Sequence, residues 1–250
     1  MTIRSATAAP QPVCRFLPAG DTGLTVEFGD VIDEHLNRLV VTFDRQVRQA
    51  DIPGVIETIP SYRSLLVLYE PQVIGAGALT DRLRALVPDH PDDQKDIRRW
   101  QIPVTYGGAY GMDLDFIAKS HDLTTGDVIA LHSGALYRVY MIGFAPGFSY
   151  LGGLPAALRT PRRADPRLTT PAGSVSLGGE QAAVSSLELP SGWHMLGRTP
   201  VRTFDLRRDR PFLLDVGDLV RFVPVGAAEF ERLDTLAASG EIVAEFEVTR

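Results

Sequence analysis

The chain has 250 residues, of which 44% are hydrophobic and 22% charged, values that suit one large or two small soluble domains. A net charge of −6 disfavours nucleic-acid binding, and the absence of any run of 18 apolar residues excludes a transmembrane helix. Residues 1–12 lack the apolar core of a signal peptide and predict a flexible tail, and the single cysteine excludes an internal disulfide and favours a cytoplasmic location.

Residues 13–90 predict a small α+β domain. Short apolar runs indicate strands, and a 3-4 spacing of apolar residues indicates helices, the first of them capped by Asp33. In chain order these are strands at 13–17 and 23–28, a helix at 33–50, strands at 55–59 and 64–69, and a helix from about residue 76. The order β-β-α-β-β-α predicts a compact, ferredoxin-like α+β sandwich.

A polar bridge over residues 88–96 predicts a domain boundary, and residues 98–225 predict a mainly β domain, either a barrel or a sandwich. Apolar residues alternate along the strand at 98–106, and Thr124 or Thr125 begins a helix with Asp127 in its first turn. The remaining predicted elements are helices at 113–121 and 124–132 and strands at 135–142, 203–206, 212–214 and 219–223. A terminal helix at 229–238 and a strand at 242–248 occupy the last segment, residues 226–250.

Residues 143–200 are unusually rich in glycine and proline. Their 58 residues include nine Gly and seven Pro, and five arginines face only three acids. Glycine and proline at this density exclude one long helix, while several aromatic residues provide apolar surface to bury. The segment therefore predicts an ordered surface of the kind that carries function on a rigid scaffold.

Several familiar catalytic patterns are absent from the sequence. It contains no P-loop, no Gly-x-Ser-x-Gly elbow and no His-Glu-x-x-His, and its two lysines, Lys95 and Lys119, lie outside glycine-rich settings. The five histidines show no metal-ligand spacing. From the sequence alone we therefore expect no nucleotide-binding motif, no activated nucleophile and no metal site in this chain.

Glycines and arginines of this segment are the candidate binding groups. Backbone amides at Gly143, Gly147, Gly152-Gly153 and Gly178-Gly179 are candidates to hold an anion in a cleft. Guanidinium groups match a carboxylate or a phosphate, and the arginines concerned are Arg162, Arg163, Arg167 and Arg198. Two alternatives stay open: the arginines pair with acids elsewhere in the fold, and the glycines serve only as turns.

Three further residues have both a functional and a structural interpretation. His132, at the end of a predicted helix, is either an acid or base for catalysis or a cap for the helix carbonyls. Glu180 is either a base beside the glycine pair or an exposed turn residue, and Trp193 belongs to the core or to the wall of the cleft.

The order of these motifs strongly resembles the family of 5-oxoprolinase B subunits, also called allophanate hydrolase subunit 1 or the Kip-type kinase inhibitor family. The resemblance covers about residues 13–232. The matching motifs include Tyr106-Gly107-Gly108, Asp113-Leu114, Leu131-His132-Ser133, the run from Gly143 to Pro155, Pro161-Arg162-Arg163, Pro166-Arg167, Pro171-Ala172-Gly173-Ser174, Gly178-Gly179, Gly192-Trp193 and Gly197-Arg198-Thr199-Pro200.

The resemblance implies a small N-terminal α+β domain followed by a cyclophilin-like barrel. It also implies that a related second subunit and a third, lactam hydrolase subunit are needed to open 5-oxoproline to glutamate with ATP. The chain departs from the family at several motifs: Gln181-Ala182-Ala183 replaces a Gln-Thr-Gly, and Leu189-Pro190-Ser191 replaces a Ser-Pro-Gly. The first removes a threonine hydroxyl that could bond a substrate.

We therefore expect one subunit of an ATP-dependent 5-oxoprolinase that is inactive alone, with ATP shared with its partner and no metal. The expected catalytic residues are His132, Arg162, Arg163 and Arg198. The expected substrate-binding residues are Gly143, Phe144, Pro146, Gly147, Arg167, Gly178, Gly179, Glu180 and Gln181. One alternative is an inhibitor that binds a sensor histidine kinase, with the ridge of Phe144, Phe148 and Tyr150 as an aromatic anchor. The other is a carboxyltransferase-type subunit of a urea or allophanate pathway enzyme.

Overall fold

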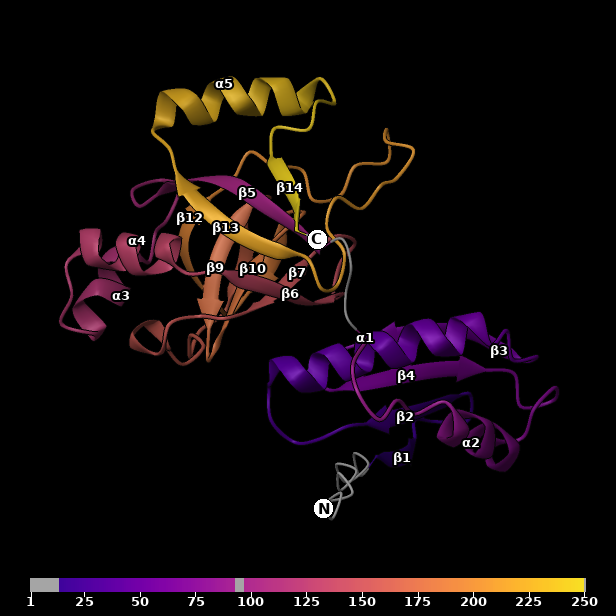
Figure 1. Cartoon of the computed structure of the whole chain (residues 1–250). Helices are drawn as coiled ribbons and strands as arrows, with labels where there is room; N and C mark the ends of the chain where they lie inside the picture. Colours follow the sequence, from indigo (N-terminus) through magenta and orange to yellow (C-terminus); the bar gives the residue numbers. More distant parts are fainter. Residues whose placement is uncertain (1–13, 93–96, 250) are drawn as a thin grey trace, which may run out of the picture. The chain divides into compact units, whose positions relative to one another are not determined.

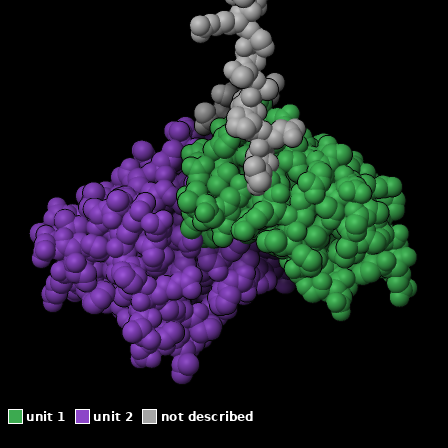
Figure 2. All heavy atoms as spheres, turned by 90° about the horizontal axis from the view of Figure 1, so that it is seen from below, with its two compact units in different colours: residues 1–93 green, residues 94–250 purple. Residues whose placement is uncertain are grey.

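The computed structural model describes residues 14–92 and 97–249, and the chain divides into two compact units, residues 1–93 and 94–250 (Figures 1 and 2). Each unit has its own apolar core. The predicted tail over residues 1–12 and part of the predicted bridge, residues 93–96, lie outside the described residues.

The first unit is an antiparallel sheet with two helices. Its elements are β1 (Arg15–Pro18), β2 (Gly23–Glu27), α1 (Glu34–Gln49), β3 (Val55–Pro60), β4 (Ser64–Tyr69) and α2 (Ala76–Ala85). The strand order is β1-β2-β4-β3, and α1 packs on β3 and β4. The predicted order β-β-α-β-β-α is therefore confirmed, with N-terminal β1 as one edge strand.

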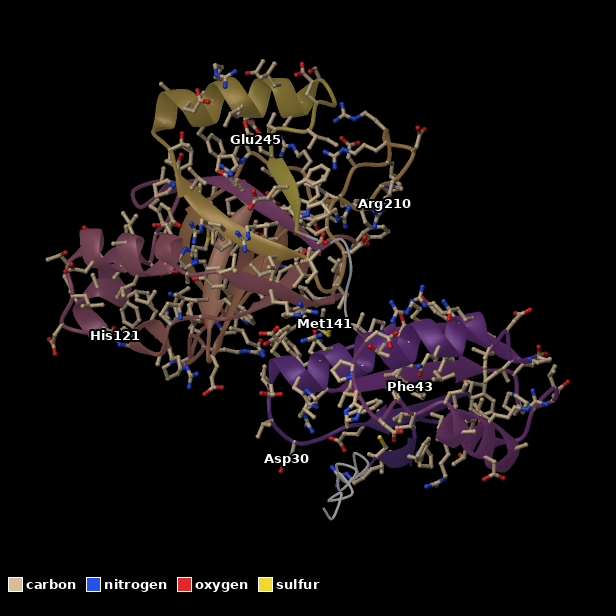
Figure 3. All side chains as sticks on the ribbon, viewed as in Figure 1. Asp30, Phe43, His121, Met141, Arg210 and Glu245 are labelled. Carbon is tan, nitrogen blue, oxygen red and sulfur yellow. The ribbon has the colours of Figure 1, made fainter. Side chains whose placement is uncertain are left out.

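Local sequence signals explain α1. The Asp33 side chain accepts a hydrogen bond of 3.1 Å from the Leu36 amide, so it caps the helix as predicted. Apolar residues three and four positions apart place Leu39, Val40 and Phe43 (labelled in Figure 3) in the core. There Phe43 meets Phe28 edge-on. Each such buried side chain contributes about 1.5–3 kcal/mol of burial free energy.

The second unit is a closed barrel with flanking helices, and these elements together give the chain an α+β fold. Its strands are β5 (Ile97–Tyr106), β6 (Tyr137–Ile142), β7 (Ser149–Gly152), β8 (Arg167–Thr170), β9 (Ser174–Gly178), β10 (Gln181–Val184), β11 (Leu189–Ser191), β12 (His194–Arg198), β13 (Leu219–Pro224) and β14 (Glu245–Thr249). The helices are α3 (Leu114–Ser120), α4 (Thr125–Gly134), the short η1 (Ala156–Leu158) and α5 (Ala227–Ala238).

Pairing of β12 with β5 closes the barrel, whose order is β12-β9-β10-β7-β6-β13-β5. β5 is long enough to pair with β12 near Tyr106 and with β14 near its start, while β13 runs parallel to it on its other edge. Closure removes the free strand edges of an open sheet. β8 and β11 form a separate two-stranded ribbon.

Two of the strands predicted for the second unit do not form. Residues 203–206 and 212–214 make only the single bridge between Phe204 and Phe212, flanked by backbone hydrogen bonds from Asp205 to Pro211 and from Leu213 to Thr203. Pro211 has no amide hydrogen to donate in return, so the pairing does not extend. The predicted last strand starts later, at Glu245, and β14 joins β5.

Candidate functional site

A hollow of about 310 Å³ opens on the second unit, in the glycine- and proline-rich segment. Its walls come from the β6–β7 turn, the segment before β8 and the β11–β12 connection. The lining residues are Phe144, Phe148, Tyr150, Arg162, Arg163, Pro166, Pro190, Ser191, Gly192 and Trp193. We call this space the aromatic hollow.

Four rings in mutual contact build one wall of the aromatic hollow. Ring centroids are separated by 5.6 Å from Phe144 to Phe148, 4.7 Å from Phe148 to Tyr150 and 5.9 Å from Tyr150 to Trp193. Phe148 and Trp193 are buried, whereas Phe144 is 66% exposed. Phe148 and Trp193 are therefore fixed in the protein, whereas Phe144, at the rim of the hollow, is exposed to solvent.

Phe144 also has a strained backbone. Its φ of +70° lies in the left-handed region, which costs a residue with a Cβ about 1–2 kcal/mol. Such strain persists only where surrounding contacts enforce it, and it is frequent at functional sites. The exposed ring at this position is therefore a candidate contact for a ligand.

Arg162 is the charged residue of the aromatic hollow that remains available to a ligand. Its guanidinium lies over the Trp193 ring, 5.5 Å from the centroid. Within the described residues it makes no ion pair or hydrogen bond. Burial raises the pKa of Tyr150, and the charge of Arg162 opposes that rise. Of the predicted arginines, Arg162 is the one placed to meet an external anion.

Arg163 and Arg167 are instead bound to Asp113, a buried carboxylate just before α3. Arg167 donates two hydrogen bonds of 2.8 and 2.7 Å to it, Arg163 donates one of 3.2 Å, and the Met195 amide donates one of 2.8 Å. Burial raises the pKa of Asp113, but the Arg167 and Met195 hydrogen bonds and the charges of both arginines outweigh it and lower the pKa overall. Arg167, predicted to bind substrate, is thus engaged in an internal ion pair.

The segment that carries Arg162 is fixed on both sides. We call residues 160–167 the strap. Thr160 accepts a hydrogen bond of 2.6 Å from the Gly179 amide, and the Pro161 carbonyl accepts one of 3.0 Å from His194. The Arg163 amide donates one of 2.7 Å to Gly192. The backbone around Arg162 is therefore held in place while its side chain stays available.

A second hollow, of about 300 Å³, shares Arg162 and Arg163 with the first. Its other walls include Phe116, stacked on His194 with a centroid distance of 4.9 Å, and His121 at the end of α3 (Figure 3). His121 is hydrogen-bonded to Thr160 over 2.9 Å. These contacts support the strap from its other side.

Arg198 lies away from the aromatic hollow. It ends β12, at the opposite end of that strand from Trp193. Its Nε and Nη2 atoms donate to the Ala172 carbonyl over 3.2 Å, and its guanidinium lies 5.4 Å from the centroid of the Phe230 ring. The structure therefore does not bring Arg198 together with Arg162 as predicted.

His132 belongs to the interior of the barrel. It has no exposed surface, stacks on Phe222 with a centroid distance of 4.7 Å, and its Nδ1 is hydrogen-bonded to the Tyr106 hydroxyl over 2.8 Å. Burial lowers the pKa of His132 to about 3. An enclosed neutral imidazole cannot exchange a proton with a surface substrate, so the geometry gives no support to its predicted catalytic role.

The glycines serve close packing more than anion binding. The Gly143 amide donates to Phe148 over 3.1 Å, and the Gly179 amide already bonds Thr160. A Cβ on Gly147 would lie 2.6 Å from Phe204, and one on Gly178 would lie 2.8 Å from the Trp193 ring. The prediction that these amides form an anion cradle is therefore not met at Gly143 and Gly179.

The remaining predicted binding residues lie outside the walls of the aromatic hollow. Glu180 forms an exposed ion pair of 2.8 Å with Arg159, and Gln181 pairs with Gly178 at the start of β10. Pro146 is exposed, and its carbonyl accepts a hydrogen bond from Ser186. Phe144, Arg162 and Arg163 are the predicted site residues that line the hollow together.

Sequence reasoning missed Asp113 as the acid that holds two of the arginines. The available signal was an acid beside an apolar residue at the start of a predicted helix, far from the arginines in sequence. The sequence predicts Trp193 in the core or in the cleft wall, and the residue serves as both because it is buried and also lines the hollow.

The described residues offer neither a metal cluster nor a membrane span. Within residues 14–92 and 97–249, no group of three or more His, Cys, Asp or Glu side chains is arranged to hold a metal ion. In the same part of the chain, no helix combines the length and hydrophobicity needed to cross a bilayer.

Residues 14–214 match the model of a protein family described as carboxyltransferase domain, subdomain C and D. The chain is 35% identical over 225 residues to the B subunit of 5-oxoprolinase from Bacillus subtilis (strain 168), covering 84% of this chain and 92% of that protein. It is 44% identical over 178 residues to the B subunit of 5-oxoprolinase from Escherichia coli O157:H7, covering 71% of this chain and 81% of that protein.

The fold is also similar to that of a larger protein. The crystal structure of the Kluyveromyces lactis urea carboxylase superimposes with a TM-score of 0.82 and 22% identity. The match covers 97% of this chain, which spans 25% of that protein. At this identity the match establishes the shared fold alone.

Proposed function

The chain belongs to the carboxyltransferase family that includes the B subunits of 5-oxoprolinase, and on this basis we propose that it is one subunit of an ATP-dependent 5-oxoprolinase. The reaction would open the lactam of 5-oxoproline to give glutamate. One observation supports a site on this chain: the aromatic hollow presents Arg162 without an internal acceptor among the described residues.

A partner requirement is part of the proposal. A lactam is stabilised by amide resonance, so its hydrolysis needs activation, for example by ATP-driven phosphorylation of its oxygen. The sequence offers neither a P-loop nor a recognisable nucleophile for these steps. We assign them to a related second subunit and to a lactam hydrolase subunit, with ATP shared across the complex and the isolated chain inactive.

The residue assignments are narrower than those made from sequence. Arg162 would contact the substrate, and Phe144 and Trp193 would cover the substrate. Arg163 would add positive charge to the site. His132 and Arg198 leave the proposed site because their contacts lie elsewhere. A ferredoxin-like domain over 13–90, a cyclophilin-like barrel over 98–225 and a C-terminal helix and strand over 226–250 remain our description of the domains. The single cysteine supports a cytoplasmic location.

The test is reconstitution with the partner subunits from the same source. The complete set should release glutamate from 5-oxoproline in an ATP-dependent manner, and omission of this chain should abolish the release. Glutamate release by this chain alone would disprove the partner requirement. No release by any combination, with every subunit folded, would disprove the proposed function.

A carboxyltransferase-type subunit of a urea or allophanate pathway is the second candidate. The observation that favours it is the match of residues 14–214 to the model of a carboxyltransferase domain family. A carboxylation assay with urea, on the same mixture supplied with bicarbonate, ATP and a biotin-carrying partner as the source of the carboxyl group, distinguishes the two candidates. Carboxylation without glutamate release would favour this second function.

A further inference from the structure

We infer that the aromatic hollow is a recognition site for small carboxylic acids that carry a five-membered ring, with Arg162 bound to the carboxylate and the aromatic wall against the ring. This inference deepens the proposed function and rests on it for the identity of the natural ligand. It assigns Arg162 a role in binding the substrate in its ground state, apart from the chemistry at the lactam bond.

The charges around the hollow select for an anion. The lining includes two arginines and no Asp or Glu. Arg163 is partly neutralised by its hydrogen bond to Asp113, whereas Arg162 makes no ion pair within the described residues. A guanidinium fork binds a carboxylate through two parallel hydrogen bonds, which makes Arg162 the specific recognition group.

Arg162 is also held ready for a ligand. Its guanidinium stacks on Trp193, and hydrogen bonds at Thr160, Pro161 and Arg163 fix the strap on both sides of it. Less side-chain and backbone freedom is therefore lost when a carboxylate binds. Asp113 acts here as a positioning residue, because it holds Arg163 and Arg167 to the barrel.

The size and lining of the hollow favour a small ring. A space of about 310 Å³ lies at the lower end of the range for small-molecule sites. The four aromatic rings, Pro166 and Pro190 provide apolar surface, while Ser191 adds a hydroxyl at the edge. A five-membered ring with one carboxylate matches both the positive charge of Arg162 and the aromatic wall of the hollow.

The experiment measures binding of four probes to the purified full chain by isothermal titration calorimetry. The probes are 5-oxoproline, cyclopentanecarboxylate, 2-pyrrolidone and acetate. We expect the first two to bind and the last two to bind at least about tenfold more weakly, because each lacks either the carboxylate or the ring. Equal binding of 2-pyrrolidone and 5-oxoproline would overturn the role of the carboxylate, and equal binding of acetate would overturn that of the ring.

Variants locate the site. Arg162→Gln should weaken 5-oxoproline binding about tenfold or more, and Arg162→Lys should give an intermediate loss because it keeps the charge without the fork. Arg159→Gln is the matched control, since Arg159 pairs with Glu180 outside the hollow. Equal losses in Arg162→Gln and Arg159→Gln, or no loss in Arg162→Gln, would overturn the inference.

The inference and the proposed function fail separately. If no probe binds to the full chain while the reconstituted complex releases glutamate, the hollow of this chain is not the carboxylate site and the proposed function stands. If carboxylates bind through Arg162 but no subunit combination releases glutamate, the site stands and the proposed function fails.

Discussion

The second unit contains two aromatic clusters, each arranged around one basic side chain. Inside the barrel, Tyr106, Tyr137 and Phe222 surround His132; in the aromatic hollow, Phe148, Tyr150 and Trp193 lie beside Arg162. The first cluster is closed, and its imidazole is neutral and bonded to a tyrosine hydroxyl. The second is open, and its guanidinium makes no ion pair within the described residues.

The comparison shows that residue type does not distinguish a structural basic group from a functional one. The sequence offered His132 and Arg162 equally as catalytic residues. Burial and internal hydrogen bonds separate them, because a charge that meets no internal acceptor and faces a hollow remains available to a ligand. Substitutions in the two clusters should therefore have different consequences.

The largest expected effect is on stability, and it should occur in only one of the clusters. His132→Ala leaves a void beside Phe222 and removes the partner of the Tyr106 hydroxyl, so the free energy of unfolding should fall by about 3 kcal/mol. Arg162→Ala should change it by less than about 0.5 kcal/mol.

Urea unfolding followed by tryptophan fluorescence provides the measurement. The chain has two tryptophans, Trp100 and Trp193, and both belong to residues 94–250, so the signal reports this unit. If Arg162→Ala destabilises the unit as much as His132→Ala does, the basic group of the hollow is structural and the contrast between the clusters is lost.

The second prediction concerns the acid that supports the strap. Asp113→Asn removes the charge opposite Arg163 and Arg167 and should lower the free energy of unfolding by about 2 kcal/mol, since both arginines retain some solvent contact. Binding of 5-oxoproline should weaken as well, although Asp113 does not line the hollow.

Asp165→Asn is the matched control for Asp113→Asn, because Asp165 is an exposed acid on the same strap. It should leave both stability and binding within error of the unaltered chain. Unchanged binding of 5-oxoproline in Asp113→Asn would contradict the positioning role of this carboxylate.

The third prediction uses the pKa of His132. Because burial holds it at about 3 in the folded barrel, against an ordinary value of 6.5, the unfolded state binds more protons between these pH values. Stability is therefore lost as the pH falls below 6.5, by about 1 kcal/mol between pH 6 and pH 5 from this group.

The measurement is urea unfolding across that pH range. The slope should flatten in His132→Gln. Part of the slope should remain even in His132→Gln, because burial also lowers the pKa of His194 despite its hydrogen bond to Pro161. An unchanged slope in His132→Gln would contradict the closed character of the barrel cluster.

The smallest expected effect tests the strain at the rim of the hollow. Phe144→Gly should be more stable than Phe144→Ala by about 0.5 kcal/mol, because glycine accepts the φ of +70° without the Cβ clash. The same pair of substitutions at Phe148 is the control, since no positive φ is recorded there and alanine should be the more stable. The same order at both positions would remove the evidence for strain at Phe144.

Locally encoded features of the fold were accessible from the sequence. Asp33 and Thr124 cap α1 and α4 as their positions predict, and the alternation of Trp100, Ile102 and Val104 identifies the core face of β5. The closure of the barrel was not accessible, because it depends on pairing between residues about a hundred positions apart. The strands predicted at 203–206 and 212–214 form only one bridge because Pro211 has no amide hydrogen with which to extend the pairing.

The segment that carries the site could be predicted from the sequence, but the role of each residue in the site could not. Glycine and proline density indicated residues 143–200, and the aromatic hollow lies there. Which arginine remains available depends on Asp113, which lies about fifty residues before Arg163 and meets it only in the folded chain. The placement of His132 likewise depends on Phe222, on a strand near the end of the chain.

The parallel pairing of β5 with β13 affects how the protein folds while it is being synthesised. Residues 97–106 leave the ribosome long before residues 219–224, so one side of β5 has no neighbour while most of the barrel is translated. The sheet of the first unit has all its strands by residue 69 and can assemble earlier. An exposed apolar strand in a nascent chain is prone to aggregate, and the second unit should therefore depend more on chaperones than the first.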